Sequence, residues 1–287
     1  MLEERTTDIR NLVLVQQKRY TNMCHAAQEI ARGVSSALDD AFAYGLALSE
    51  ETITDSLALC LARIGGTGTF AGDTKVHVAQ HTKRREHRTG ADWEWFIGNG
   101  KLFDHYIVQS KRLDMRATPA AYRDLRTRDR RQIRTLLDAA DIARSSEGLN
   151  TTPLYAFYNG CRQRATPDHG ITITSAARLL EMLENGCRGT FTELHDRRDA
   201  RPWETLFCAA PEDGRRKPLP DRMKSWIESA SHTRSDSGEG GGGGTAARLE
   251  IESTDGIFRY ARRLLLVVMK SEPPPTDEPM PQILSLE

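Results

Sequence analysis

The chain has 287 residues, of which 38% are hydrophobic, so it can bury the core of a folded domain of ordinary size. Its 40 Lys and Arg residues balance its 40 Asp and Glu residues, so net charge alone indicates neither an acidic nor a basic partner. The longest aliphatic run, 264–269, is too short to span a bilayer, and residues 1–5 lack the pattern of a signal peptide; we therefore expect a cytoplasmic protein without a membrane segment.

The first part of the chain is predicted to be helical. Apolar residues at helical spacing predict an N-terminal region of two helices within residues 1–48, packing on the rest of the fold. Ser49 is expected to cap the next helix, because its hydroxyl can accept a first-turn N–H and the acids Glu50 and Glu51 suit the positive end of a helix. A Gly-rich turn ends this helix near residue 65, and residues 70–80 alternate well enough to form a strand.

A β-hairpin is predicted over residues 90–112, with its turn at Gly100 and Lys101. Strand alternation separates a polar face from an aromatic face, because successive side chains point to opposite sides of a sheet. With the turn at this position, Asp92 lies directly opposite Gln109 on the polar face. The aromatic residues expected in the core of this sheet are Trp93, Trp95, Tyr155 and Phe157.

The following segments complete an alternating pattern of helices and strands. Residues 124–144 show apolar residues at helical spacing on an Arg-rich surface, and 153–158 reads as a short buried strand. A helix over 175–185 and a buried segment over 202–208 come next. The order from residue 50 to 158 is therefore helix, strand, strand, strand, helix, strand, which indicates an α/β fold with a mixed central sheet flanked by helices.

The C-terminal part divides by composition. Residues 211–245 end in a Gly-rich run and are predicted to be a flexible linker or loop. Residues 246–270 are predicted to return to the core as strands. The tail, 271–287, is Pro-rich with four acids and no base, which is typical of a disordered segment.

The polar face of the hairpin carries a set of residues suited to phosphodiester hydrolysis. Asp92 and a second acid can hold a hard divalent cation through oxygen, Gln109 can add its carbonyl oxygen, and Lys111 lies one step further along the same face. The second acid is expected to be Glu51 on the preceding helix, with Glu50 as the fallback. Glu94 shares the face and is either a further metal ligand or the partner of a nearby Arg.

These segments resemble the PD-(D/E)xK nuclease superfamily, particularly its Mrr-like branch, in which the last motif reads QxK. The resemblance rests on residues 90–92 (GAD) and 108–112 (VQSKR), and it covers roughly residues 50–158. It implies that Asp92 and Gln109 belong to a metal site, that Lys111 is the catalytic lysine, and that Glu51 is the helix acid. No proline precedes Asp92, and Gln109 replaces an acid, which leaves fewer negative charges to hold a metal.

The resemblance implies a restriction-endonuclease-like domain over residues 49–210 that cleaves DNA with Mg²⁺ or Mn²⁺ and serves in restriction or defence against foreign DNA. RNA is an alternative substrate, and a homodimer or a partner subunit is a possible source of specificity. Two other readings stay open. In the first, the chain is a nucleic-acid-binding protein of the same fold that has lost catalysis. In the second, it is an interaction protein whose basic helix contacts an acidic partner.

Positive charge is concentrated around the hairpin. Residues 81–134 hold fourteen Lys and Arg against seven Asp and Glu, as a surface that meets a polyanion requires, although a solvated Arg-rich helix face would look the same. Gln132 on this helix faces either the site or solvent. The residues predicted to contact nucleic acid are Lys83, Arg84, Arg85, Arg88, Arg112, Arg130 and Arg131.

The five cysteines form no CxxC pair, and their odd number is poorly suited to a disulfide framework. We therefore expect a reducing compartment and no structural zinc. The histidines near the hairpin lack metal-binding helical spacing, and neither a phosphate loop nor a serine-hydrolase elbow is present.

Overall fold

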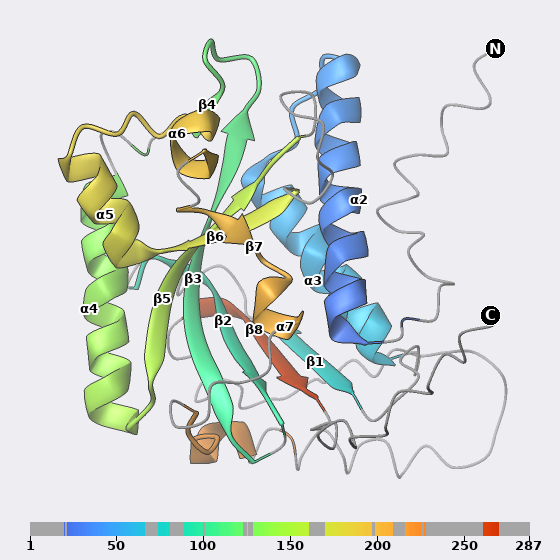
Figure 1. Ribbon diagram of the computed structural model, residues 1–287. Helices are drawn as coiled ribbons and strands as arrows, with labels where there is room; N and C mark the ends of the chain where they lie inside the picture. The colour runs from blue at the N-terminus through green and yellow to red at the C-terminus, as the bar shows by residue number, and fades with distance from the viewer. Residues whose placement is uncertain are drawn as a thin grey trace, which may run out of the picture.

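The chain forms an α/β fold in which a mixed sheet is flanked by helices, as the sequence predicted (Figure 1). The computed structural model describes residues 20, 22–66, 74–80, 89–99, 101–122, 125, 129–160, 170–196, 199–208, 216–224, 227 and 261–269. The helices are α2 (Met23–Ala43), α3 (Glu50–Gly66), α4 (Asp129–Glu147), α5 (Ala176–Glu184), α6 (Phe191–His195) and α7 (Thr205–Cys208). The strands are β1 (Lys75–Gln80), β2 (Ala91–Gly98), β3 (Phe103–Asp114), β4 (Ala121–Tyr122), β5 (Thr151–Tyr158), β6 (Ile171–Ser175), β7 (Arg201–Pro202) and β8 (Ala261–Val268).

The eight-stranded sheet has the order β1-β8-β2-β3-β5-β6-β7, with β4 paired to β3. The order of elements along the chain from α3 to β5 is the expected one, with the two-residue β4 added. The position of β8 was not expected. It runs parallel to β2 and antiparallel to β1, and so separates two strands that are neighbours in the chain. Its residues 264–267 are fully buried, and a strand covered on both faces takes such a continuous apolar run.

The hairpin of β2 and β3 has the register predicted from the sequence, since Trp93 lies opposite Val108 and Gly98 opposite Phe103. The turn is fixed by Asn99, whose side-chain oxygen accepts the N–H groups of Lys101 and Leu102. A side chain that satisfies turn N–H groups in this way explains why the chain reverses here.

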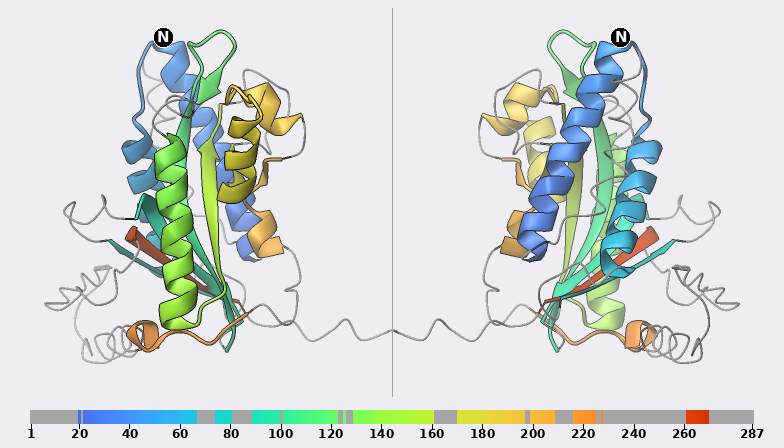
Figure 2. Two further views of the ribbon diagram at one scale, coloured as in Figure 1. Left: turned by 90° about the vertical axis from the view of Figure 1, so that its left-hand side faces the viewer. Right: turned by 90° about the vertical axis from the view of Figure 1, so that its right-hand side faces the viewer.

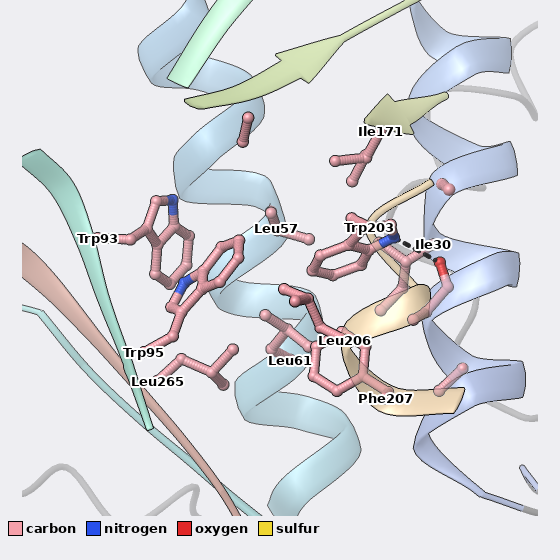
Figure 3. Packing of buried hydrophobic residues seen from close by; sticks show 14 of the residues in the cluster. Ile30, Leu57, Leu61, Trp93, Trp95, Ile171, Trp203, Leu206, Phe207 and Leu265 are labelled. Carbon is pink, nitrogen blue, oxygen red and sulfur yellow. Dashed lines mark hydrogen bonds between the residues drawn. The ribbon is translucent and has the colours of Figure 1, made fainter. Parts of the chain in front are cut away.

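One face of the sheet carries the aromatic core and is covered by α2 and α3 (Figure 2). Trp93 and Trp95 are buried there, as expected, and Trp203 packs between them and α2 (Figure 3). The indole N–H of Trp203 donates to the carbonyl of Ala27 at 3.0 Å. This bond gives the buried indole the partner it needs and fixes α2 against the segment that follows β7.

The opposite face is covered by α4 and α5 (Figure 2). Ile133 and Leu136 of α4 pack on a cluster that contains Tyr155 and Phe157, both buried as expected. Only one stripe of α4 is apolar, and polar residues occupy the rest of the helix surface.

Two expectations are corrected by the structure. Of the two helices predicted within residues 6–48, one is described, α2; residues 1–19 lie outside the description, so the other helix stays a prediction. Residues 216–224, placed in the predicted linker, pack on the fold through buried Leu219 and Met223, because this short stretch offers apolar side chains to the sheet. Most of the remaining predicted linker, the whole tail (271–287) and the segment before β8 lie outside the described residues.

The second correction concerns the cysteines, for which no disulfide was expected. Cys24 at the start of α2 is bonded to Cys208 at the end of α7. The two residues are 184 positions apart in the sequence, and only the packing of α7 on α2 brings them together. Sequence spacing carries no sign of such a pair. In the described part of the chain, no helix is both long and apolar enough to cross a membrane.

Candidate active site where β2 and β3 part

Three of the four predicted catalytic residues, Asp92, Gln109 and Lys111, lie at a fork in the sheet. Pairing between β2 and β3 ends at Trp93 opposite Val108, whereas β3 continues to pair with β5 as far as Arg112 opposite Tyr158. Beyond the fork β3 lacks its β2 neighbour, so its main-chain groups need other partners. A polar side chain at the start of β2 is well placed to supply one.

Asp92 supplies that partner. Its Oδ2 accepts the main-chain N–H of Ser110 at 2.7 Å and the side-chain amide of Gln109 at 2.8 Å. The structure thus brings Asp92 and Gln109 together as the predicted register required. Two donors on one carboxylate oxygen hold the half-buried Asp92 side chain in a single orientation.

The network continues from Gln109 to α4. Gln109 Oε1 accepts a 2.6 Å hydrogen bond from Gln132 Nε2, and Gln132 Oε1 accepts a 3.1 Å hydrogen bond from the ammonium of Lys111. Gln132 therefore faces the site and not solvent, which settles the alternative that the sequence left open. The four side chains form one continuous chain from carboxylate to ammonium: Asp92, Gln109, Gln132 and Lys111.

Gly90 allows α4 to approach the fork. Its φ of +70° is a conformation that other residues adopt at a cost, and a Cβ here would lie 3.2 Å from the carbonyl oxygen of Gln132. The main chain of β2 can therefore begin directly beneath the helix that carries Gln132. This close approach is what allows Gln132 to reach both Gln109 and Lys111.

The two acids in the first turn of α3, Glu50 and Glu51, differ in burial. Ser49 caps this turn as predicted, accepting the N–H of Thr52 at 3.0 Å. Glu51 is exposed, whereas Glu50 is half-buried and its charge acts on the hydroxyl of Tyr158. Burial raises the pKa of Tyr158 to about 12, and the negative charges of Asp92 and Glu50 add to this rise. The charge of the fallback residue, Glu50, therefore acts on Tyr158 together with that of Asp92, and the role of Glu51 stays a prediction.

Tyr158 is a site residue that the sequence analysis missed. Its hydroxyl donates to Ser110 Oγ at 3.1 Å and lies 3.1 Å from Thr54 Oγ1. It therefore connects α3, β3 and the end of β5 behind the carboxylates. The sequence gives little indication of this role, because a tyrosine at the end of a buried strand is predicted to be a core residue.

Glu94 does not join the site. It is 1% exposed, accepts a 2.9 Å hydrogen bond from His105, and forms an ion pair with Arg222, which also pairs with Glu147. Burial alone would raise the pKa of Glu94, but the charge of Arg222 and the hydrogen bond from His105 lower it below its ordinary value. Of the two roles considered for Glu94, the structure supports the partner of an arginine.

The predicted nucleic-acid contacts are only partly described. Arg112 is half-buried and follows Lys111 on β3, while Arg130 and Arg131 are exposed in the first turn of α4 beside Gln132. Arg130 also donates to the carbonyl of Leu183 at 2.8 Å. The others lie outside the described residues: Lys83, Arg84, Arg85 and Arg88.

A family model described as a family of unknown function, DUF6615, matches residues 23–282, which is most of the chain. The chain belongs to the DUF6615 family. The match begins with α2 and includes β8, so it contains the whole fork, and no curated protein or solved structure matches the chain.

The donor set at the fork of this DUF6615 chain fits a hard divalent cation. The described residues contain no cluster of three or more His, Cys, Asp or Glu side chains that could enclose a metal. Mg²⁺, however, keeps several waters and is held by one or two carboxylates. Asp92 and Glu50 provide carboxylates, and Gln109 Oε1 has a second lone pair besides the one that accepts from Gln132. All these donors are oxygens, the type that Mg²⁺ and Mn²⁺ prefer.

Proposed function

We propose that this protein is a metal-dependent nuclease that hydrolyses phosphodiester bonds in DNA, acts in the cytoplasm, and serves in restriction or defence. The observation that carries the proposal is the hydrogen-bonded chain from Asp92 through Gln109 and Gln132 to Lys111 at the fork. A set of surface polar residues without function has no need of such a connection between a carboxylate and an ammonium.

Each residue of the network has a role in this proposal. Asp92 and Glu50 would hold Mg²⁺ or Mn²⁺, which when bound polarises the phosphate and acidifies a water molecule. Gln109 orients the carboxylate of Asp92 and offers its own carbonyl oxygen. Gln132 holds the ammonium of Lys111, so that this positive charge is already in place to stabilise the charge that develops on the phosphate.

The resemblance to the Mrr-like branch of the PD-(D/E)xK superfamily supports the same assignment, because Asp92, Gln109 and Lys111 occupy the positions of its motifs. Arg112, Arg130 and Arg131 lie next to network residues in the chain and would bind the phosphate backbone. These contacts carry no sequence information. Specificity for a sequence would therefore come from another part of the chain or from a partner.

The test is cleavage of plasmid and single-stranded DNA by the full chain with Mg²⁺ or Mn²⁺. Lys111→Ala is expected to lower the rate by about 10²- to 10³-fold, because it removes a fixed charge at the reacting phosphate. Lys101→Ala is the matched control, since Lys101 is an exposed lysine in the turn at the other end of the hairpin. Intact substrates at high concentrations of the wild-type protein would contradict the enzymatic proposal.

A nucleic-acid-binding protein without catalysis is the second candidate. Two observations favour it: the described residues contain no cluster of three or more His, Cys, Asp or Glu side chains that could hold a metal, and Gln109 Oε1 already accepts a 2.6 Å hydrogen bond from Gln132. On this alternative, the wild type and Lys111→Ala bind DNA in a salt-dependent manner and neither cleaves it.

A further inference from the structure

Three buried hydroxyl groups meet behind the fork, on the face of the sheet that α3 covers. The hydroxyl of Tyr158 at the end of β5 donates to Ser110 Oγ at 3.1 Å and lies 3.1 Å from Thr54 Oγ1 of α3. Each of the three residues is at most 1% exposed. A buried polar group is costly unless it is hydrogen-bonded, and a fully bonded buried network specifies a single arrangement of the elements that carry it. These hydroxyl groups therefore fix one position of α3 on the sheet.

The same contact ties down the first turn of α3. The hydroxyl of Thr54 donates to the main-chain carbonyl of Glu50 at 2.7 Å. Residues four apart lie on the same face of a helix, so Glu50 belongs to the face of α3 that carries Thr54. In agreement with this, Glu50 is half-buried, whereas Glu51 is exposed. The contact between Thr54 and Tyr158 therefore determines where the turn that carries Glu50 lies relative to β3 and β5.

Ser110 joins this contact to Asp92. Its main-chain N–H donates to the carboxylate of Asp92 at 2.7 Å, and its Oγ accepts from Tyr158. An unbroken series of hydrogen bonds and short hydroxyl contacts thus runs from Asp92 through the sheet to the first turn of α3. The charges of Asp92 and Glu50 both act on the hydroxyl of Tyr158, so this oxygen lies within electrostatic range of both carboxylates.

The two acids proposed as metal ligands come from different elements, Asp92 from the start of β2 and Glu50 from the first turn of α3. Mg²⁺ demands a near-ideal octahedron of oxygens at about 2.0–2.1 Å, so the two carboxylates must be held at a suitable separation. Groups behind the ligands usually hold them in place, and the loss of such a group lowers metal affinity by about 10- to 100-fold. The buried hydroxyl groups are in the position to do this here.

We infer that Tyr158 is a positioning residue, which sets the separation of the carboxylates of Asp92 and Glu50 and thereby the affinity of the fork for a divalent cation. The inference rests on the proposed function, because that proposal makes these two acids the metal ligands. Tyr158 acts through its neighbours, since its buried hydroxyl is engaged by Ser110 and Thr54.

Binding of Mn²⁺ to the full chain, measured from the EPR signal of the free ion, tests the inference in the absence of substrate. Tyr158→Phe removes the hydroxyl and keeps the ring, and it should weaken Mn²⁺ binding by about tenfold or more. Tyr106→Phe should bind like the wild type. It is the matched control, because Tyr106 packs on the same face of the sheet but lies within the paired part of the hairpin, opposite Trp95. Asp92→Asn should lose the site, which shows that the bound ion lies at the fork.

Substitutions of Thr54 test the contact from the side of the helix. Thr54→Val keeps the shape of the side chain without its hydroxyl, and it should weaken Mn²⁺ binding about as much as Tyr158→Phe does. Because both changes remove the same contact, the double variant should bind no more weakly than Tyr158→Phe alone. Thr54→Ser keeps the hydroxyl and should bind like the wild type. At saturating Mn²⁺, DNA cleavage by Tyr158→Phe should approach the wild-type rate, since the reacting groups are unchanged.

Urea denaturation of the same variants separates this role from a purely structural one. A Tyr158→Phe variant that is less stable but binds Mn²⁺ like the wild type would overturn the inference, and so would Mn²⁺ binding that survives in Asp92→Asn. Cleavage by a wild type whose Mn²⁺ affinity does not depend on Tyr158 would leave the nuclease proposal standing without this role. A Mn²⁺ site that depends on Tyr158 in a chain that cleaves no DNA would support the inference and contradict the nuclease proposal.

Discussion

The main-chain N–H of Ser110 donates a 2.7 Å hydrogen bond to the carboxylate of Asp92 at the point where β2 and β3 part. The side chain thus takes the place of the strand partner that β3 loses there. One residue therefore serves both the fold and the candidate site, and substitutions at Asp92 can separate these two roles.

Asp92→Asn is expected to retain most of the stability and to lose cleavage, because an amide oxygen can still accept from Ser110 while the charge that holds a cation is gone. Asp92→Ala is expected to lose both. It leaves the buried N–H of Ser110 without its acceptor and removes one of the two acceptors of the Gln109 amide, at a cost of about 1–3 kcal/mol in the free energy of unfolding. Urea denaturation and DNA cleavage of both variants provide the measurement. Equal loss of stability in the two would contradict the structural role.

Gln132 is a positioning residue, and Gln132→Met should release Lys111 and the carbonyl of Gln109 together. We expect kcat to fall about tenfold or more with little change in KM, since the affinity for the nucleic-acid backbone depends on other residues. Arg134→Met, at an exposed position two residues along α4, is the matched control. A variant of Gln132 whose loss lies wholly in KM would show that it binds the substrate and does not position Lys111.

The ion pair between Glu94 and Arg222 is expected to make stability depend on pH. The pKa of Glu94 is lowered in the folded protein, so the folded state releases this proton more readily than the unfolded state. The stabilisation is present above the unfolded pKa of about 4.3 and is lost as the pH falls through the lower folded value. Urea midpoints measured between pH 6 and pH 3 should fall less steeply in Glu94→Gln than in the wild type. Glu181→Gln, at an exposed glutamate of α5, should keep the wild-type slope.

Arg222→Met tests the same pair from the other side. Among the described residues it leaves the buried carboxylate of Glu94 with His105 as its one remaining partner, and removing one member of a buried ion pair costs about 3–5 kcal/mol. Thermal or urea denaturation at pH 7 measures this loss. If Arg222→Met were as stable as the wild type, the segment 216–224 would not be anchored through this pair.

Gly90→Ala is expected to weaken both the fold and the site. The positive φ alone costs about 1–2 kcal/mol for a residue with a Cβ, and here the new Cβ also meets the carbonyl of Gln132 at 3.2 Å. Gly148→Ala is the matched control, because Gly148 has a φ of +65° and open space around its Cβ position. The difference in the free energy of unfolding between the two variants measures the contact with α4. Cleavage should fall only in Gly90→Ala.

The sequence by itself determined the hairpin and the residues that face each other across it. The order of elements from α3 to β5 and the register that sets Asp92 opposite Gln109 follow from local signals, namely alternation, a cap at Ser49 and a turn at Lys101. Such signals act between residues close in the chain, so they can be recognised without knowledge of the rest of the fold.

Only the tertiary structure decided which residues complete the site and which strand completes the sheet. Gln132 could be assigned to the site only from the packing of α4 on the sheet, because a helix face is defined by what it packs against. In the same way, only the packing of α3 shows that the charge of Glu50 acts on Tyr158. The insertion of β8 between β1 and β2 and the bond between Cys24 and Cys208 join segments far apart in the chain. No local pattern encodes such contacts, since they depend on the packing of the whole core.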